Sequence, residues 1–354
     1  MGGLVAFLVS LVISEGLLPS WAMRSRASFA SLVAALALAG CKSAPVVRAT
    51  PPDASDDAGA GSTVTAVVSR ADASPSLVPL PLAVESKKRD VTDVYGPSAR
   101  IRVLEDAFIV AGVGPGDYFD RAVDFVDRTL KAFYNGRFER RPPYAVLLFF
   151  FGRFPDYAAY VDRHFHVNPK DYYGIYGTYS HVAAVDGSGG LPYLPTLSHE
   201  LAHAIIESGD FPERPAWFGE CVASLYEAPT FPAPGEIGGQ PSWRDREVLR
   251  PALHPKDGGS APDVRLDLLF GMDDDTFKAT LPDGGTNAPV LAVHEATARA
   301  VCEWLDSRGK LWPLYHAWRA HFADDPIGVA SFTAVLGATP QEANDAWRKW
   351  AERL

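Results

Sequence analysis

Two histidines with a glutamate between them form the pattern in this chain that most clearly could do chemistry. The run reads His199-Glu200-Leu201-Ala202-His203. On an α-helix of about 3.6 residues per turn, residues four apart lie on one face, so His199 and His203 can bind one metal ion. Glu200 is rotated by roughly 100° from His199, which keeps its carboxylate beside the ion without making it a ligand. The pattern therefore predicts a metal site with a general base that can take a proton from an attacking water.

A third carboxylate ligand follows the histidine pair at a short distance in the sequence. Glu220 ends the run Pro215-Ala216-Trp217-Phe218-Gly219-Glu220. Residues that start and stop helices predict one helix over 195–206 and a second over 215–227. Two consecutive helices joined by a short loop can form a hairpin, and such a hairpin would bring Glu220 back to the two histidines.

Two histidines and one glutamate are a common set of ligands for catalytic zinc. This set leaves the fourth coordination position open, whereas structural zinc sites usually close all four positions with Cys and His. We therefore expect Zn²⁺ as the cofactor, with His199, His203 and Glu220 as its ligands. Glu227 is the alternative third ligand, and an exposed glutamate at the helix end is the simpler interpretation of that residue. A bound zinc ion would lower the pKa of water to about 7 and polarise a carbonyl group.

At these residues the chain resembles the gluzincin metallopeptidases, and most closely the bacterial peptidase MA-like group, which is similar to the catalytic domains of thermolysin and aminopeptidase N. The matching runs are Thr196-Leu197-Ser198-His199-Glu200-Leu201-Ala202-His203 and Pro215-Ala216-Trp217-Phe218-Gly219-Glu220. The resemblance implies a zinc-dependent peptidase in which the two histidines and Glu220 hold the metal and Glu200 is the catalytic base. The family commonly reads Asn-Glu-Gly around its third ligand, and this chain departs from it with Gly219-Glu220-Cys221.

The first 41 residues have the features of an export signal. Met23-Arg24-Ser25-Arg26 is basic, Phe29 to Ala37 is apolar but too short to span a bilayer, and Leu38-Ala39-Gly40-Cys41 resembles a bacterial lipobox. We expect translation to start at Met23 and Cys41 to carry a lipid that anchors the protein to a membrane. The protein would then be a lipoprotein of the cell envelope, and the lack of an aspartate after the cysteine favours the outer membrane, facing the periplasm or the cell surface. A plain signal peptide or a short membrane anchor is the alternative.

The rest of the chain divides by composition into a tether and one domain. Residues 42–90 are rich in Ala, Ser, Pro, Asp and Val without periodicity, so we expect a flexible tether. Residues 91–354 are enough for one domain with a sizeable core. We divide this domain into a sheet-containing part over 91–194, the metal-site helices over 195–228, and a helical part over 240–354.

Apolar patterns before the metal motif predict a small mixed β-sheet. Strands are expected over 99–104, 107–111, 144–151, 174–179 and 181–186, and helices over 115–134 and 154–164. The order of these elements predicts an α+β, zincin-like fold in which the sheet packs on the metal helix. The family resemblance implies that the strand before the metal helix is an edge strand that pairs with an extended peptide, so 181–186 is the candidate for binding substrate. An ordinary internal strand is the alternative.

The C-terminal part shows helical spacing of apolar residues throughout. Helices are expected over 266–270, 274–279, 293–306, 312–322 and 340–354. In the family, many members place a tyrosine near the start of a later helix, and His294 occupies the corresponding position here. His294 could donate a hydrogen bond to the oxyanion of a tetrahedral intermediate, although a surface or helix-capping histidine is the alternative. The weaker candidates for this role are Tyr226, Tyr315 and His316.

Cysteine usage and charge restrict the remaining possibilities. Cys221 and Cys302 lie on predicted helices, and we expect isolated buried thiols because a disulfide between helices needs tight geometry. A disulfide between them, formed in an oxidising compartment, is the alternative. The chain has 33 Lys and Arg against 43 Asp and Glu, a net charge of −10, without a basic cluster. We therefore do not expect the protein to bind nucleic acid.

The leading functional prediction is a lipid-anchored zinc metallopeptidase that acts on a peptide or protein substrate. The chain lacks the Gly-x-Met-Glu-Asn motif of aminopeptidases, which favours an endopeptidase. One alternative is a binding or structural lipoprotein that keeps the scaffold without turnover, and another is a zinc hydrolase of amide bonds in the cell wall. No residue pattern indicates an oligomeric state.

Overall fold

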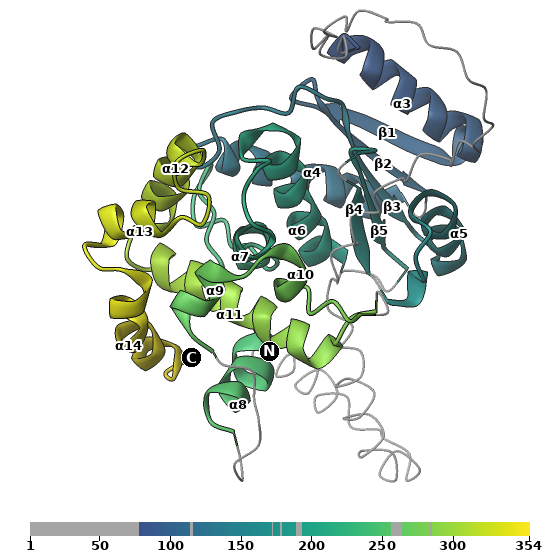
Figure 1. Cartoon of the computed structure of the whole chain (residues 1–354). Coiled ribbons are helices and arrows are strands. Elements are labelled where there is room, and N and C mark those ends of the chain that lie inside the picture. The colour runs from purple at the N-terminus through teal and green to yellow at the C-terminus, as the bar shows by residue number, and fades with distance from the viewer. Residues whose placement is uncertain are drawn as a thin grey trace, which may run out of the picture.

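The described part of the chain is an α+β assembly of one mixed sheet and many helices (Figure 1). A computed structural model describes residues 78–113, 116–171, 173–177, 179–188, 193–255, 264–282 and 285–354. The expected α+β class is confirmed. The export signal, the lipobox with Cys41 and the expected tether as far as residue 77 lie outside the described residues.

Five strands form a single sheet in the order β1-β2-β3-β5-β4. Strands β1 (Ala99–Leu104) and β2 (Phe108–Val113) are an antiparallel hairpin. Strands β3 (Val146–Phe151) and β5 (Val182–Asp186) continue the sheet in parallel with β2, and β4 (Gly174–Gly177) closes it in the antiparallel direction. These strands lie where the sequence predicts them.

Helices cover both faces of the sheet, which explains why every residue of β3 is buried. One face packs on α4 (Gly116–Phe133) and α6 (Tyr193–Ile205), and the other on α3 (Leu80–Tyr95) and α5 (Phe154–Phe165) (Figure 1). The apolar core therefore has two parts, one on each side of the sheet. Helix α6, which carries the metal motif, belongs to the larger part.

Helix α3 corrects the expected boundary of the tether. The segment up to residue 90 was expected to be flexible, but α3 begins at Leu80 and buries Val84 and Val91 against the sheet. These two valines are seven residues apart and so lie on the same face of the helix. The charged residues between them, Lys87-Lys88-Arg89-Asp90, hid this sparse apolar stripe.

The edge of the sheet also differs from the expectation. Strand β5 was the candidate edge strand for substrate, but it lies between β3 and β4 and pairs with both. The internal position, which was the alternative, is therefore the one found. The described sheet has β1 at one edge and β4 at the other, and β4 packs on α6 as β5 does.

Two consecutive helices carry the metal motif, as expected. Helix α6 continues into a π-helical turn at Ile206–Asp210, and α7 spans Ala216–Leu225. Asp210 is fully buried at the end of this turn, where its carboxylate accepts hydrogen bonds from the guanidinium of Arg319. This contact joins the end of the metal helix to the C-terminal helices.

The C-terminal part is helical, as predicted, and two of its helical segments were not foreseen, at 245–253 and 329–336. None of the helices in the described ranges is long and apolar enough to cross a membrane.

Tyr226 and Tyr315 are buried among aromatic rings, and His316 lies beside Glu139 on the surface. The remaining helical elements are the short turns Gly96–Ser98 and Pro169–Asp171, the π-helix Asp245–Leu249, α8 (Arg250–Leu253), α9 (Leu266–Gly271), α10 (Asp274–Phe277), α11 (Ala288–Asp306), α12 (Leu311–His321), α13 (Val329–Leu336) and α14 (Pro340–Ala351).

Candidate metal centre

Helices α6 and α7 bring the three expected ligands together. The Nε2 atoms of His199 and His203 are 3.0 Å apart. The carboxylate of Glu220 lies 3.4 Å from Nε2 of His199 and 3.3 Å from Nε2 of His203. All three side chains are buried. This buried group could bind a metal ion.

The spacing of the donor atoms is close to that of a tetrahedral site. Ligand atoms bound at about 2.0–2.1 Å to one tetrahedral ion lie roughly 3.3 Å apart. The two Nε2 atoms are 3.0 Å apart, and the two oxygens of Glu220 divide between the histidines, with Oε2 at 3.4 Å from His199 and Oε1 at 3.3 Å from His203. Among the described residues three side chains form this group, and a tetrahedral ion held by three protein ligands has a fourth position for water or another ligand.

Each histidine has a carboxylate close to its Nδ1 atom, and each of these carboxylates forms an ion pair with an arginine. Nδ1 of His199 lies 3.2 Å from Oε1 of Glu227, whose other oxygen pairs with Arg244. Nδ1 of His203 lies 3.1 Å from Oε1 of Glu207, which pairs with Arg214. A carboxylate at Nδ1 accepts the proton there and leaves the lone pair of Nε2 for a metal. Nδ1 of His203 is hydrogen-bonded to Glu207, and Nδ1 of His199 is in ion-pair distance of Glu227. Both carboxylates therefore stand where they can keep a proton on Nδ1 once a metal displaces the proton of Nε2.

The carboxylates give the centre a negative potential. Burial alone would lower the pKa of His203, but Glu220 and Glu207 raise it to about 9. Burial would raise the pKa of Glu220, yet the two histidines hold it well below its ordinary value. The pKa of Glu227 falls to about 2, because Arg244 and His199 outweigh the effect of burial. Such surroundings attract a cation, and a metal that binds here would displace protons from the histidines.

Glu200 is buried beside the ligands and points toward the edge strand β4. Burial raises its pKa to about 7, since the nearby histidines offset this only in part. A Cβ atom added at Gly174 of β4 would lie 2.9 Å from Oε1 of Glu200 and 2.3 Å from Cγ2 of Thr196. A pKa near neutrality suits a group that takes up and releases a proton in one reaction.

Gly219, one of the two departures from the family pattern, has a structural reason. A Cβ atom at this position would lie 2.8 Å from Nε and from Nη2 of Arg214. The absence of a side chain therefore lets the guanidinium lie against α7 and reach Glu207. An asparagine here would displace the arginine that orients the partner of His203.

The second departure, Cys221, is explained by a disulfide bond with Cys302. The expectation of isolated thiols is wrong. Helices α7 and α11 pack closely along their lengths, which brings the two Cα atoms to 5.4 Å, within the range that a disulfide spans. The bond joins the helix that carries Glu220 to the first long C-terminal helix.

His294 lies on α11, as expected, and contacts α10. Its Nδ1 donates a hydrogen bond to the carbonyl of Phe277 at 2.9 Å, and its ring stacks on the Phe277 ring. The next residue, Glu295, is buried and is electrostatically coupled to Glu220 and His199. Burial raises the pKa of Glu295 to about 8, with Arg244 opposing the rise.

Sequence reasoning did not identify the outer residues of the centre. Glu207 lies four residues after His203, a spacing that places both on one helix face and could have revealed it. Glu227 was considered only as a ligand or an exposed residue, and Glu295 was not considered. Both depend on how α7, the loop after it and α11 pack together, which no local spacing indicates.

Comparison with known proteins adds no family assignment to this geometry. No protein-family model matches the chain, and no curated protein matches it. The resemblance to gluzincins therefore rests on the sequence motifs.

Proposed function

We propose that this protein is a zinc-dependent metallopeptidase that hydrolyses internal peptide bonds. The observation that carries the proposal is the convergence of His199, His203 and Glu220 at tetrahedral spacing, with Glu200 buried beside them. The outer carboxylates support it, because they set the tautomer that a zinc ligand needs. Zinc fits this nitrogen and oxygen donor set, and when bound it supplies a Lewis acid and lowers the pKa of water to about 7.

Glu200 acts as the proton carrier in the proposed reaction. Its carboxylate takes the proton of the attacking water and later delivers it to the nitrogen of the leaving amine, so one group serves both half-reactions. The pKa of about 7 supports this role. His294 is the proposed oxyanion donor, since α11 packs on the ligand helix α7. Its Nδ1 donates to Phe277, so Nε2 can donate to the oxyanion only while the ring carries both protons.

The edge strand β4 is the proposed binding place for an extended peptide. It lies at one end of the described sheet, and Gly174 lies close to Glu200. A peptide that added to this edge would gain main-chain hydrogen bonds while one of its carbonyl groups approached the metal centre. This replaces β5, which is an internal strand.

An exported location remains part of the proposal. The lipid anchor at Cys41 is proposed from the sequence alone, with the outer membrane as its site. The Cys221–Cys302 disulfide supports an oxidising compartment, because disulfides are rare in reducing cytosol.

A peptide library tests the reaction class. The zinc-loaded protein should cleave internal bonds of N-acetylated peptides, and both zinc removal and Glu220→Ala should abolish cleavage. Glu213→Ala is the matched control, because Glu213 is exposed in the loop between the ligand helices. Cleavage of cell-wall muropeptides alone would identify an amide hydrolase of the cell wall. Zinc binding without any cleavage would identify a silent scaffold.

A further inference from the structure

A pocket lies on the face of the sheet opposite the metal centre. Its floor is formed by Leu147 and Phe149 of β3 and Val182 of β5, which belong to the part of the core under α3 and α5. The metal helix α6 packs on the other face. The cavity volume is about 250 Å³. Drug-sized ligands occupy pockets of roughly 300–1,000 Å³, so this pocket suits a smaller molecule.

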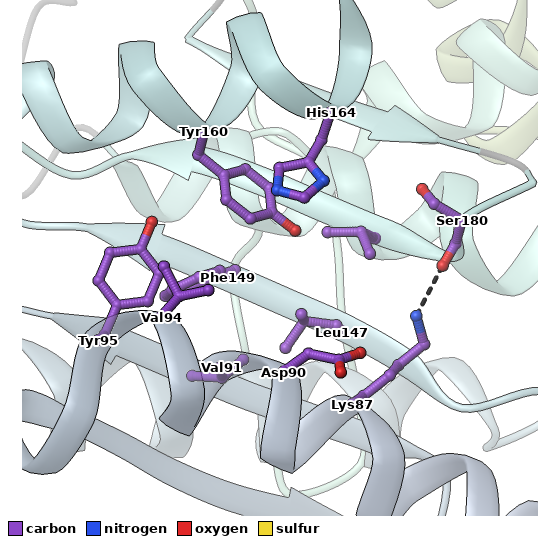
Figure 2. Close-up of a pocket in the computed structure, with 11 residues that line it drawn as sticks. Lys87, Asp90, Val91, Val94, Tyr95, Leu147, Phe149, Tyr160, His164 and Ser180 are labelled. Carbon is purple, nitrogen blue, oxygen red and sulfur yellow. Dashed lines mark hydrogen bonds between the residues drawn. The ribbon is translucent and has the colours of Figure 1, made fainter.

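The inside of the pocket is apolar and aromatic. Val91 and Phe149 are buried at its base, and the rings of Tyr95 and Tyr160 flank Phe149 at 5.0 and 5.4 Å between centroids. Burial raises the pKa of Tyr95 to about 12 and raises that of Tyr160 as well. Both hydroxyl groups are therefore neutral at physiological pH. The ring of Tyr160 also contacts the exposed ring of His164 at the rim (Figure 2).

Two opposite charges lie at the rim of this apolar space. Lys87 and Asp90 are three residues apart on α3, so their side chains lie on neighbouring positions of one helix face (Figure 2). Nζ of Lys87 donates one hydrogen bond to the carbonyl of Ser180 at 2.7 Å, which leaves two of its three donors. The carboxylate of Asp90 is exposed and attracts the ammonium group of Lys87 electrostatically, and it makes no hydrogen bond or close salt bridge with any residue that the structure describes.

We propose that this pocket binds a free α-amino acid with an apolar side chain. The ammonium group pairs with Asp90, the carboxylate pairs with Lys87, and the side chain enters the space over Val91, Leu147 and Phe149. An α-amino acid carries both charges on one carbon atom, so both can face the rim while the side chain points inward. The site does not depend on the metal centre or on peptidase activity.

The charge pair selects against simpler amphipathic molecules. A fatty acid or another apolar carboxylate would bring a negative charge toward Asp90, and an apolar amine would bring a positive charge toward Lys87. Only a molecule with both charges satisfies the two side chains, and like charges placed side by side lower affinity. Leucine and phenylalanine have the required chemistry and size.

Titration calorimetry of the full chain with leucine and two analogues tests the proposal. Leucinamide lacks the carboxylate and 4-methylpentanoate lacks the ammonium group, so each should bind about tenfold more weakly than leucine. Asp90→Asn should remove the preference for leucine over 4-methylpentanoate, because the partner of the ammonium group is lost. Lys87→Met should remove the preference for leucine over leucinamide, because the partner of the carboxylate is lost. The matched controls Asp93→Asn and Lys88→Met change the same residue types on α3 outside the pocket and should bind leucine like the wild type.

Three results would overturn the proposal. The first is that leucine at about 10 mM does not bind, because the dissociation constant would then be larger than the millimolar value expected for a small ligand with a specific site. The second is leucine binding that Asp90→Asn and Lys87→Met leave unchanged. The third is leucine binding that disappears when zinc is removed, because that would place the ligand at the metal centre. Asp90 is exposed and Lys87 half-buried, and circular dichroism of both variants should match that of the wild type.

Discussion

Nδ1 of His199 lies 3.2 Å from the carboxylate of Glu227, a residue that the sequence alone presented as a spare metal ligand. Glu227 instead stands behind the histidine and is itself held by Arg244. Glu207 and Arg214 repeat the arrangement behind His203. The two imidazoles are thus each oriented by a separate ion pair.

Removing either outer carboxylate should weaken zinc binding while leaving all three ligands in place. Glu227→Gln and Glu207→Gln should each lower zinc affinity by about 10–100-fold, because the amide no longer fixes the proton on Nδ1. Competition with a chromogenic chelator measures the affinity. Glu236→Gln, an exposed change in the loop after α7, is the control. Affinities equal to that of the control would show that the outer carboxylates do not orient the histidines.

The ligand set could be predicted from sequence because its information is local. The spacing of His199 and His203 on one helix, and a second helix that starts at Pro215, were enough to place Glu220 with them. Most strands could be predicted for the same reason, since β3 is a continuous apolar run.

The parts that sequence missed depend on long-range packing. The order of β4 and β5 in the sheet is decided by which of them pairs with β3, a long-range contact that the composition of a single strand does not specify. The disulfide of Cys221 depends on the packing of α7 on α11, 81 residues apart in sequence. Helix α3 has too few apolar residues to show a pattern, and it is stabilised by its contacts with the sheet.

The disulfide should contribute strongly to the stability of the fold. The cross-link closes a loop of 81 residues, for which restriction of the unfolded chain amounts to about 4 kcal/mol. The double variant Cys221→Ala/Cys302→Ala should therefore unfold at a markedly lower urea concentration than the wild type. Reductant should lower the midpoint of the wild type and leave that of the double variant unchanged. Two free thiols in the unreduced, denatured chain without its N-terminal 41 residues would refute the bond.

Glu295 should make the metal-free protein lose stability as pH rises. Burial raises its pKa in the folded state to about 8, above the ordinary value of 4.5. The unfolded chain releases this proton first, so the stability from the protonated group is complete below pH 4.5 and is lost as pH rises through 8. Glutamine at position 295 stays neutral at every pH. The free energy of unfolding of Glu295→Gln should therefore exceed that of the wild type by an amount that grows between these pH values and then levels off. Urea unfolding in the presence of a chelator measures it, and a pH-independent difference would contradict the assignment.

The most direct test of the central claim is the kcat/KM for an N-acetylated peptide of Glu200→Gln, measured together with its zinc content. Glutamine preserves the shape of the side chain but cannot accept the proton of the attacking water. We expect one zinc per chain in both proteins and a fall in kcat/KM of about 10²–10⁴-fold in the variant. A variant that keeps its zinc and cleaves the peptide at the wild-type rate would contradict the claim.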